Sequence, residues 1–146
     1  MLGHGSGGRM MHNLIGDLFI KHFGNSILNE QTDAAILTMG STEMAFTTDS
    51  FVIDPLFFPG GNIGKLAVCG TVNDLAVTGA EPFYLSVSFI IEEGFPMRDL
   101  EVIVKSLAEE AKKAGVLIVT GDTKVVNKGK SDKLFINGSH RYALFP

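Results

Sequence analysis

The spacing of apolar residues predicts two long helices. Between Asn62 and Pro82, apolar side chains recur at helical spacing, as one buried face requires: Ile63, Leu66, Ala67, Gly70, Leu75 and Ala76. The Pro-Gly-Gly at 59–61 precedes this helix, and Gly79 ends it. A second helix is predicted over 97–114, with apolar residues on one side and charged residues on the other. Its charged face is interpreted as solvated surface.

A third helix-like stretch follows a glycine-rich start. Residues 3–8 read GHGSGG, and the apolar residues after them mark one buried face: Met10, Met11, Leu14, Ile15, Leu18, Phe19 and Phe23. Glycines let backbone N–H groups approach a phosphate closely, and the start of a helix attracts negative charge. The motif is neither a Walker loop nor a dinucleotide fingerprint. It therefore leaves two interpretations open, a phosphate-binding loop or an unstructured tail.

Apolar runs predict five strands. The first two, 34–39 and 43–53, are joined by Gly40-Ser41-Thr42, which suits a hairpin turn. The run 83–91 is typical of a strand buried on both faces or lying at a subunit interface, where we expect Phe89 to contribute. Two shorter strands are predicted over 116–120 and 133–137. No internal repeat or linker separates these elements, so the chain is interpreted as one domain.

Composition restricts the class of protein. The 146 residues suffice for one domain, which buries about two thirds of its unfolded surface. No apolar run is long enough to span a membrane and the N-terminus lacks a signal-peptide layout, so we expect a cytoplasmic protein without a membrane partner. The net charge of -4 and scattered basic residues argue against a nucleic-acid partner. The single cysteine, Cys69, cannot form an internal disulfide and is interpreted as a buried structural thiol.

Four aspartates stand at or near the ends of apolar elements: Asp33, Asp49, Asp74 and Asp122. Asp49 is unusual because strands are depleted in aspartate, so it either lies on a solvated face or serves a site. Asp74 interrupts a helix of small apolar residues, where a carboxylate is costly to bury without a cation, a donor or an open cavity. Asp122 follows a predicted strand, at a sheet edge where ligand sites of α/β proteins form. The neighbouring Lys124 would pair with a phosphate or with a surface acid.

Converging carboxylates would repel one another and would also repel the phosphates of a nucleotide. A divalent cation removes both problems, since magnesium usually takes one or two carboxylates together with phosphate oxygens and water. With the glycine-rich loop on the far side, the pattern suits Mg-ATP. Spacing alone makes this a hypothesis, because no single short motif is diagnostic.

Several segments, in this order, resemble one protein family. TDAA at 32–35, TTDSFVIDP at 47–55, the stretch 59–80 with its VNDLAVTGA, and GDTKVV at 121–126 are similar to the N-terminal domain of the aminoimidazole ribonucleotide synthetase superfamily. Selenophosphate synthetase and thiamine monophosphate kinase belong to the same group. GHGSGG and the long motif from Asp54 resemble in particular the HypE family of hydrogenase maturation proteins. The resemblance covers residues 2–137.

The resemblance implies an α+β fold: a mixed four- to five-stranded sheet with helices on one face, and sheets of two subunits pairing into a barrel. It would place magnesium and the ATP phosphates among the four aspartates Asp33, Asp49, Asp74 and Asp122. Nucleotide contacts would come from Thr48, from Gly121 and from the loop residues Gly5, Ser6 and Gly7. Asp74 and Lys124 match positions associated with ATP use, which makes them the catalytic candidates.

The implied activity is the ATP-dependent dehydration of a carboxamide, carried as a thiocarbamate on a C-terminal cysteine, to a thiocyanate. That product supplies the cyanide ligands of nickel-iron hydrogenase. The implied partners are a second copy of the chain, the carbamoyltransferase HypF and the HypC-HypD complex.

The sequence departs from this family near its end. The family has a second domain and a tail that ends in the acceptor cysteine, whereas residues 138–146 do not resemble it. We therefore expect a family domain over 1–137, a non-family tail over 138–146, and a chain that does not complete the reaction alone. The alternatives are a non-catalytic dimerisation module and another branch of the superfamily, the kinase or the selenophosphate synthetase. Ser6 disfavours that last alternative, because it stands where a cysteine would be expected in the loop.

Overall fold

Five strands form one mixed sheet in a computed structural model that describes residue 5 and residues 7–141. The sheet order is β1-β2-β7-β5-β6, with β1 (Ala35–Met39), β2 (Thr42–Phe51), β5 (Tyr84–Glu92), β6 (Leu117–Val126) and β7 (Leu134–Arg141). β5 and β6 run parallel, and the other neighbouring strands run antiparallel. This arrangement confirms the predicted mixed sheet.

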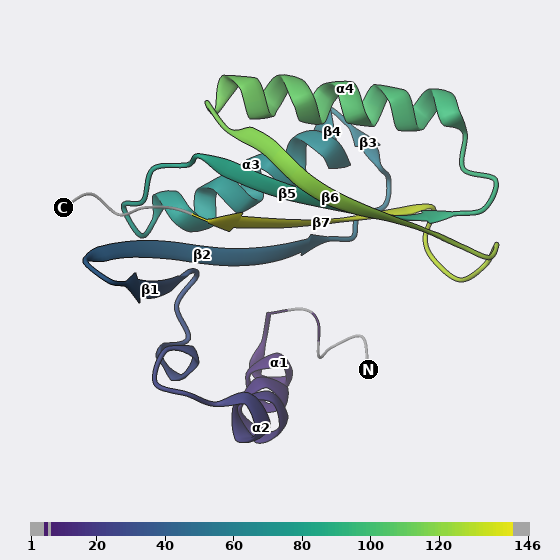
Figure 1. Cartoon of the computed structure of the whole chain (residues 1–146). Helices are drawn as coiled ribbons and strands as arrows, with labels where there is room; N and C mark the ends of the chain where they lie inside the picture. Colours follow the sequence, from purple (N-terminus) through teal and green to yellow (C-terminus); the bar gives the residue numbers. More distant parts are fainter. Residues whose placement is uncertain (1–4, 6, 142–146) are drawn as a thin grey trace.

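Two helices, α3 (Ile63–Ala76) and α4 (Met97–Lys113), pack together on one face of the sheet (Figure 1). The main core lies between them and the strands, and its fully buried side chains include Ile63, Leu85, Ile103, Leu134 and Ile136. The predicted α+β fold with helices on one face is therefore confirmed. We call the opposite side, which α3 and α4 leave uncovered, the open face.

The N-terminal helical segment lies apart from this core, on the side of the open face (Figure 1). It consists of α1 (Arg9–Leu14), the π-helix η2 (Ile15–Ile20) and α2 (Lys21–Phe23), and a short 3-10 helix, η3 (Leu28–Glu30), follows it. None of these elements contains a buried residue. The predicted helix forms, but its apolar face packs on no part of the described core.

Helix α3 begins at an asparagine cap. The side-chain oxygen of Asn62 accepts hydrogen bonds from the backbone N–H groups of Gly64 (2.9 Å) and Lys65 (3.2 Å), which satisfies donors that the first helical turn leaves free. The glycine-rich stretch before Asn62 instead forms a small hairpin of β3 (Phe57–Phe58) and β4 (Gly61–Asn62). The predicted helix is confirmed. Its last residue is Ala76, and Gly79 ends it as predicted: with a φ of 78°, Gly79 donates its N–H to the Ala76 carbonyl oxygen (3.0 Å), and the Ala80 N–H donates to that of Leu75 (3.3 Å).

Three strand predictions need correction. β6 continues to Val126, so Gly121 and Asp122 lie inside a strand, and nine of its ten residues are exposed rather than buried. β7 reaches Arg141, four residues past the expected boundary at Asn137. Its Gly138 is buried beside Thr71 of α3, and a Cβ at Gly138 would lie only 2.8 Å from Thr71 Oγ1.

β5 is not buried on both faces in this single chain. Leu85 and Val87 are buried under the helices, whereas Tyr84 and Ile90 remain 51% and 41% exposed on the open face. Phe89 packs against the helix-side core, so it does not lie where a partner could cover the open face. The described part of the chain contains no helix long and apolar enough to cross a membrane.

Candidate acidic site

Three of the four predicted aspartates gather at one edge of the sheet, and we call Asp33, Asp49 and Asp74 the acidic cluster. Asp33 precedes β1, and its carbonyl oxygen accepts a hydrogen bond from Thr47 Oγ1 of β2 (2.9 Å). Asp49 lies on β2 and faces α3, since a Cβ at Gly70 would lie 3.6 Å from Asp49 Oδ2. Asp74 follows Gly70 by one helical turn. The bend before β1, strand β2 and helix α3 thus bring the cluster together.

The pKa of Asp74 is shifted by its surroundings. Partial burial raises the pKa of the Asp74 carboxyl, and the nearby carboxylates of Asp49 and Asp33 raise this pKa further. None of the ion pairs among the described residues involves a member of the acidic cluster. The cluster is therefore a concentration of negative charge without a cationic side chain to balance it.

The carboxylates of the acidic cluster are too far apart to hold a metal ion between three of them. Within residues 7–141, no three His, Cys, Asp or Glu side chains lie close enough together to hold one ion. This spacing suits a cation that takes one or two carboxylates and completes its shell with phosphate oxygens and water, as magnesium commonly does. Asp49 lies on β2 and Asp74 on α3, and the charge of Asp49 raises the pKa of Asp74 more than that of Asp33 does, so Asp49 and Asp74 are the first candidates for such ligands.

Two residues that support Asp49 were not predicted. The backbone N–H of Ser50 donates a hydrogen bond to Asp49 Oδ1 (2.9 Å), which orients the carboxylate. Gly70 admits the strand beneath α3, because a Cβ there would lie 2.7 Å from the Phe51 ring. The TTDS motif contains Ser50, but nothing in the sequence indicated that Gly70 faces Asp49.

Asp122 and Lys124 lie at the other edge of the sheet. β7 and β5 separate β6 from β2, so three strand spacings place Asp122 about 14 Å from β2. Lys124 Nζ donates to Asp122 Oδ1 (2.6 Å), and this bond is the main reason that the pKa of Asp122 is lowered. Of the two partners expected for Lys124, the single chain therefore provides a surface acid.

Asp122 also lies on the opposite face from Asp49. Its row across the sheet continues through Ser88 and Asn137 to Ser50, and successive side chains of a strand point to opposite faces. Asn137 Nδ2 donates to Ser50 Oγ (2.8 Å) on the open face. The four aspartates predicted around magnesium are thus not brought together within one chain.

The predicted nucleotide contacts are also dispersed. Thr48 lies on the open face, where Ser139 Oγ donates to its hydroxyl (2.9 Å). Gly121 is required by packing, since a Cβ there would lie under 3.0 Å from the Val87 carbonyl oxygen of β5. Gly5 and Gly7 are exposed with open space around them, and Ser6 lies outside the described residues.

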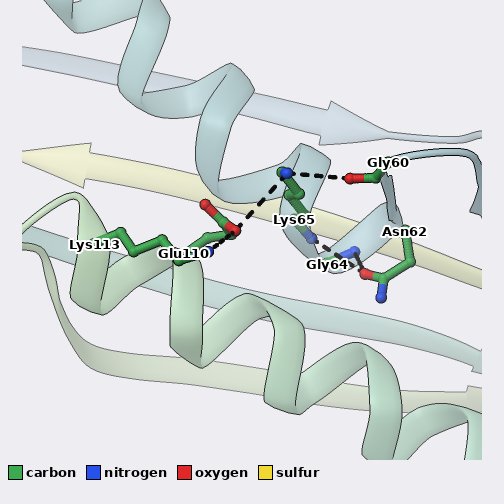
Figure 2. A network of polar contacts seen from close by, with 6 residues as sticks. All are labelled: Gly60, Asn62, Gly64, Lys65, Glu110 and Lys113. Atoms are coloured by element: carbon green, nitrogen blue, oxygen red, sulfur yellow. Dashed lines mark hydrogen bonds and ion pairs between the residues drawn. The ribbon is translucent and has the colours of Figure 1, made fainter.

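The end of α3 far from Asp74 is fixed by a polar network (Figure 2). Lys65 Nζ donates to the Gly60 carbonyl oxygen (3.1 Å) and lies 3.9 Å from Glu110 Oε1 of α4. Lys113 Nζ donates to the same carboxylate (2.7 Å), and chiefly this bond lowers the pKa of Glu110. The network joins α3 to α4, while the acidic cluster at the other end has no such partners. Cys69, between the two ends, is partly buried and forms no disulfide.

A groove of about 580 Å³ runs between α4 and β6, next to Asp122. Apolar side chains form most of its walls, including Phe89, Val104, Leu107 and Ile118. A second cavity, of about 450 Å³, lies where β2 and β5 end and includes Glu92 and Lys133. Neither cavity contains a member of the acidic cluster.

Comparison with known proteins agrees with the fold. Residues 31–140 match the family described as AIR synthase related protein, N-terminal domain. The carbamoyl dehydratase HypE of Escherichia coli K12 is 60% identical over 141 residues, which cover 93% of this chain and 42% of that protein. HypE of Bradyrhizobium diazoefficiens is 56% identical over 136 residues, covering 93% of this chain and 39% of that protein. The chain thus spans about two fifths of the length of the curated relatives it matches.

Solved structures give the same result. A HypE-HypF complex contains a chain 55% identical to this one, with a TM-score of 0.84 over 91% of this chain and 43% of that chain. HypE in complex with ATP is 53% identical, with a TM-score of 0.70 over 100% of this chain and 43% of that chain. Thiamine monophosphate kinase from Aquifex aeolicus has a TM-score of 0.72 over 93% of this chain and 44% of that chain, but only 17% identity, and so shares the fold alone.

Proposed function

Because this chain belongs to the family of AIR synthase related proteins, N-terminal domain, we propose that it is the Mg-ATP-binding domain of a HypE-like hydrogenase maturation factor. The observation that carries the proposal is the acidic cluster, whose three carboxylates have no cationic side chain paired with them. A HypE protein 53% identical to this chain has been solved with ATP bound. A cation bound between the acidic cluster and the phosphates would allow a negatively charged nucleotide to bind beside these carboxylates.

Each residue has a definite part in this proposal. Asp49 and Asp74 would hold the cation, which would neutralise the nucleotide phosphates, and the carboxylate of Asp33 would add to the negative potential that attracts it. Ser50 keeps the Asp49 carboxylate oriented through its backbone N–H. Lys124 is suited to a phosphate because its ammonium is a compact charge on a flexible stem. Gly5, Ser6 and Gly7 would cover the nucleotide, with Thr48 and Gly121 beside it.

The activity of the whole protein is also part of the proposal. By its likeness to the carbamoyl dehydratases, this domain would use ATP to dehydrate a thiocarbamate carboxamide to a thiocyanate, the source of cyanide for nickel-iron hydrogenase. Phosphorylation of the amide oxygen would turn a poor leaving group into phosphate. Asp74 and Lys124 remain the catalytic candidates, and the acceptor cysteine would have to come from outside residues 1–146, because Cys69 lies within α3.

Partners follow from the same likeness. We propose that the chain pairs with a second copy through its sheet, forming a barrel, and works with HypF and the HypC-HypD complex in the cytoplasm. A HypE-HypF complex has been solved with a chain similar to this one. In the chain itself, the uncovered apolar side chains of Tyr84 and Ile90 support pairing through the open face.

Calorimetry tests whether the domain binds a nucleotide. We expect ATP to release binding heat with the purified chain when magnesium is present and little or none when EDTA replaces it, because the cluster repels free phosphates. Titration of magnesium without ATP serves as the control for metal binding alone.

The same titration separates this function from the alternative of a dimerisation module, which the uncovered open face also fits. A chain that is dimeric by sedimentation but gives no heat at millimolar Mg-ATP would be such a module, and the proposed nucleotide function would then be wrong.

A further inference from the structure

The cavity of about 450 Å³ at the ends of β2 and β5 has no part in the proposed nucleotide site. Its lining comes from residues 55–57 after β2, residues 92–96 after β5, Asp99 of α4, and Lys128 and Lys133 before β7. The Ile63 N–H at the start of α3 donates to the Leu56 carbonyl oxygen of this lining (2.9 Å), whereas Asp74 lies near the end of α3. The helical rise from Ile63 to Asp74 is about 16 Å, so the cavity and the acidic cluster are well separated.

Apolar side chains form most of the cavity's surface. Leu56 is buried, Phe95 packs against the main core, and Phe57 remains 41% exposed. Sites that bind small organic molecules commonly measure roughly 300–1,000 Å³ and are lined in the same way, by apolar and aromatic side chains with a few polar groups. The volume and the lining of this cavity are therefore those of a small-molecule site.

The walls are held in place within the single chain. The carboxylate of Glu92 accepts hydrogen bonds from the backbone N–H groups of Gly129 and of Lys133 (3.1 Å for Lys133), which fixes the loop before β7 against the end of β5. Pro55 and Pro96, whose rings restrict the backbone, also line the cavity. A wall that is already ordered loses little conformational entropy when a ligand binds, so more of the contact energy appears as affinity.

Two of the five charged side chains in the lining already have partners. Lys133 Nζ donates to the Asp54 carboxylate (3.1 Å), and Glu92 accepts the two backbone hydrogen bonds. The other three, which take part in no ion pair within residues 7–141, are Glu93, Asp99 and Lys128. These three give the lining two carboxylates against one ammonium group, an excess of negative charge.

This combination selects the chemistry of the ligand. An apolar body that fills the cavity partly dehydrates Glu93 and Asp99, which is costly unless a cation pairs with them. A cation is also attracted by the aromatic faces of Phe57 and Phe95. An anion would meet the single ammonium of Lys128 and be repelled by both carboxylates.

We propose that this cavity is a binding site for a small organic cation with an apolar body. The body lies among Leu56, Phe57 and Phe95, and Glu93 and Asp99 hold the positive charge. The inference does not depend on the proposed nucleotide function, because the two sites share no residue.

Three probes of one size and different charge test the site. 2-Phenylethylamine, 2-phenylethanol and 3-phenylpropanoate are each titrated into the purified chain at pH 7, and backbone amide shifts are followed by NMR. We expect the amine to shift the amides of Glu93, Gly94 and Asp99 with a dissociation constant of about 1 mM, as suits a ligand of this size. The propanoate should bind about tenfold more weakly, because attraction is replaced by repulsion, and the alcohol should lie between them.

A double variant tests the role of the two carboxylates. In Glu93→Gln combined with Asp99→Asn, the amine should bind no better than the alcohol, while the affinity for the alcohol stays that of the parent. Glu109→Gln is the matched control, because it removes a negative charge from an exposed position of the same helix as Asp99 and away from the cavity. This control should keep the full preference for the amine.

Three results would overturn the proposal. They are the absence of saturable shifts with the amine, shifts confined to residues away from the cavity, and equal or tighter binding of the propanoate. A preference for the amine that survives in the double variant would also overturn it, since the charge would then be held elsewhere. A chain that binds no Mg-ATP but shows the expected shifts would contradict the nucleotide function alone.

Discussion

Replacing Gly64 with alanine is expected to destabilise the domain more than a glycine-to-alanine replacement at any other helical position. Gly64 lies in the first turn of α3, where this helix crosses α4. A Cβ at Gly64 would lie under 3.0 Å from the Ile103 carbonyl oxygen and 3.0 Å from Ile103 Cγ2. The carbonyl belongs to a helical backbone, so the two helices must move apart. The expected cost is about 3 kcal/mol, which corresponds to a fall in melting temperature of roughly 6–12 °C.

The matched control is Gly16→Ala. Gly16 is also in a helical segment, but a Cβ there has open space within 4 Å, and the segment lies outside the core. Thermal unfolding followed by circular dichroism should show an unchanged melting temperature for Gly16→Ala and a large fall for Gly64→Ala. Equal melting temperatures for the two variants would contradict the described crossing of α3 and α4.

Replacing Asp74 with asparagine is expected to have opposite effects on stability and on nucleotide binding. In the metal-free chain, burial and the charges of Asp49 and Asp33 disfavour the ionised Asp74 carboxylate. The variant removes this cost, so its melting temperature at neutral pH in EDTA should rise. The same change removes a proposed magnesium ligand, and the loss of one charged contact of about 2 kcal/mol weakens Mg-ATP binding about thirtyfold.

The dependence on pH gives this prediction a definite sign. The pKa of Asp74 is raised in the folded state above the ordinary value of 3.8, so the folded chain binds a proton more tightly than the unfolded chain. The penalty is present in full above the raised pKa, decreases as the pH falls through it, and is absent below about 3.8. The stability advantage of Asp74→Asn should follow the same course.

Asp132→Asn is the control, because it makes the same change at an exposed loop position. Stability is measured by thermal unfolding between pH 4 and pH 7, and binding is measured by calorimetry. An Asp74→Asn chain that is less stable than the parent at pH 7 without metal would show that the carboxylate supports the fold rather than strains it.

The helices and the hairpin were predictable because their signals are local. The repeat of apolar residues identified part of the buried side of α3, since Ile63, Ala67 and Leu75 are buried, whereas Ala76 is exposed and the buried Val68 and Thr71 were not predicted. The run 97–114 matched α4 to within one residue. The residue that caps the start of α3 was predicted less accurately. The predicted start relied on the Pro-Gly-Gly stretch, whereas Asn62 provides the two hydrogen bonds that begin the helix.

The extent of β6 was not predictable from residue preferences. Gly121 and Asp122 are both poor strand formers, so they indicated the end of a strand. They remain in the strand because β5 offers a parallel partner along its whole length and because Gly121 alone fits beside the Val87 carbonyl. Pairing with β5, rather than the local sequence, determines that this segment remains in the strand.

The four aspartates were selected together from the sequence, and their membership in one site stays a prediction, whereas their arrangement in the fold was not predicted. The family resemblance selected the four aspartates together, and the fold joins three of them through the contact of β2 with α3. Asp122 is separated because β7, the last strand in the chain, pairs between β2 and β5. Such long-range strand order is not encoded in the spacing of residues along the sequence, so the distance between Asp49 and Asp122 could not be foreseen.

In the proposed function, the acidic cluster holds the metal of a bound nucleotide. The most direct test is a crystal of this chain grown with a non-hydrolysable ATP analogue and manganese in place of magnesium, with the metal located by its anomalous scattering. We expect a manganese peak within about 2.5 Å of carboxylate oxygens of Asp49 or Asp74, with phosphate oxygens completing its shell. A nucleotide whose metal lies away from the cluster, with Asp33, Asp49 and Asp74 all facing solvent, would contradict the account.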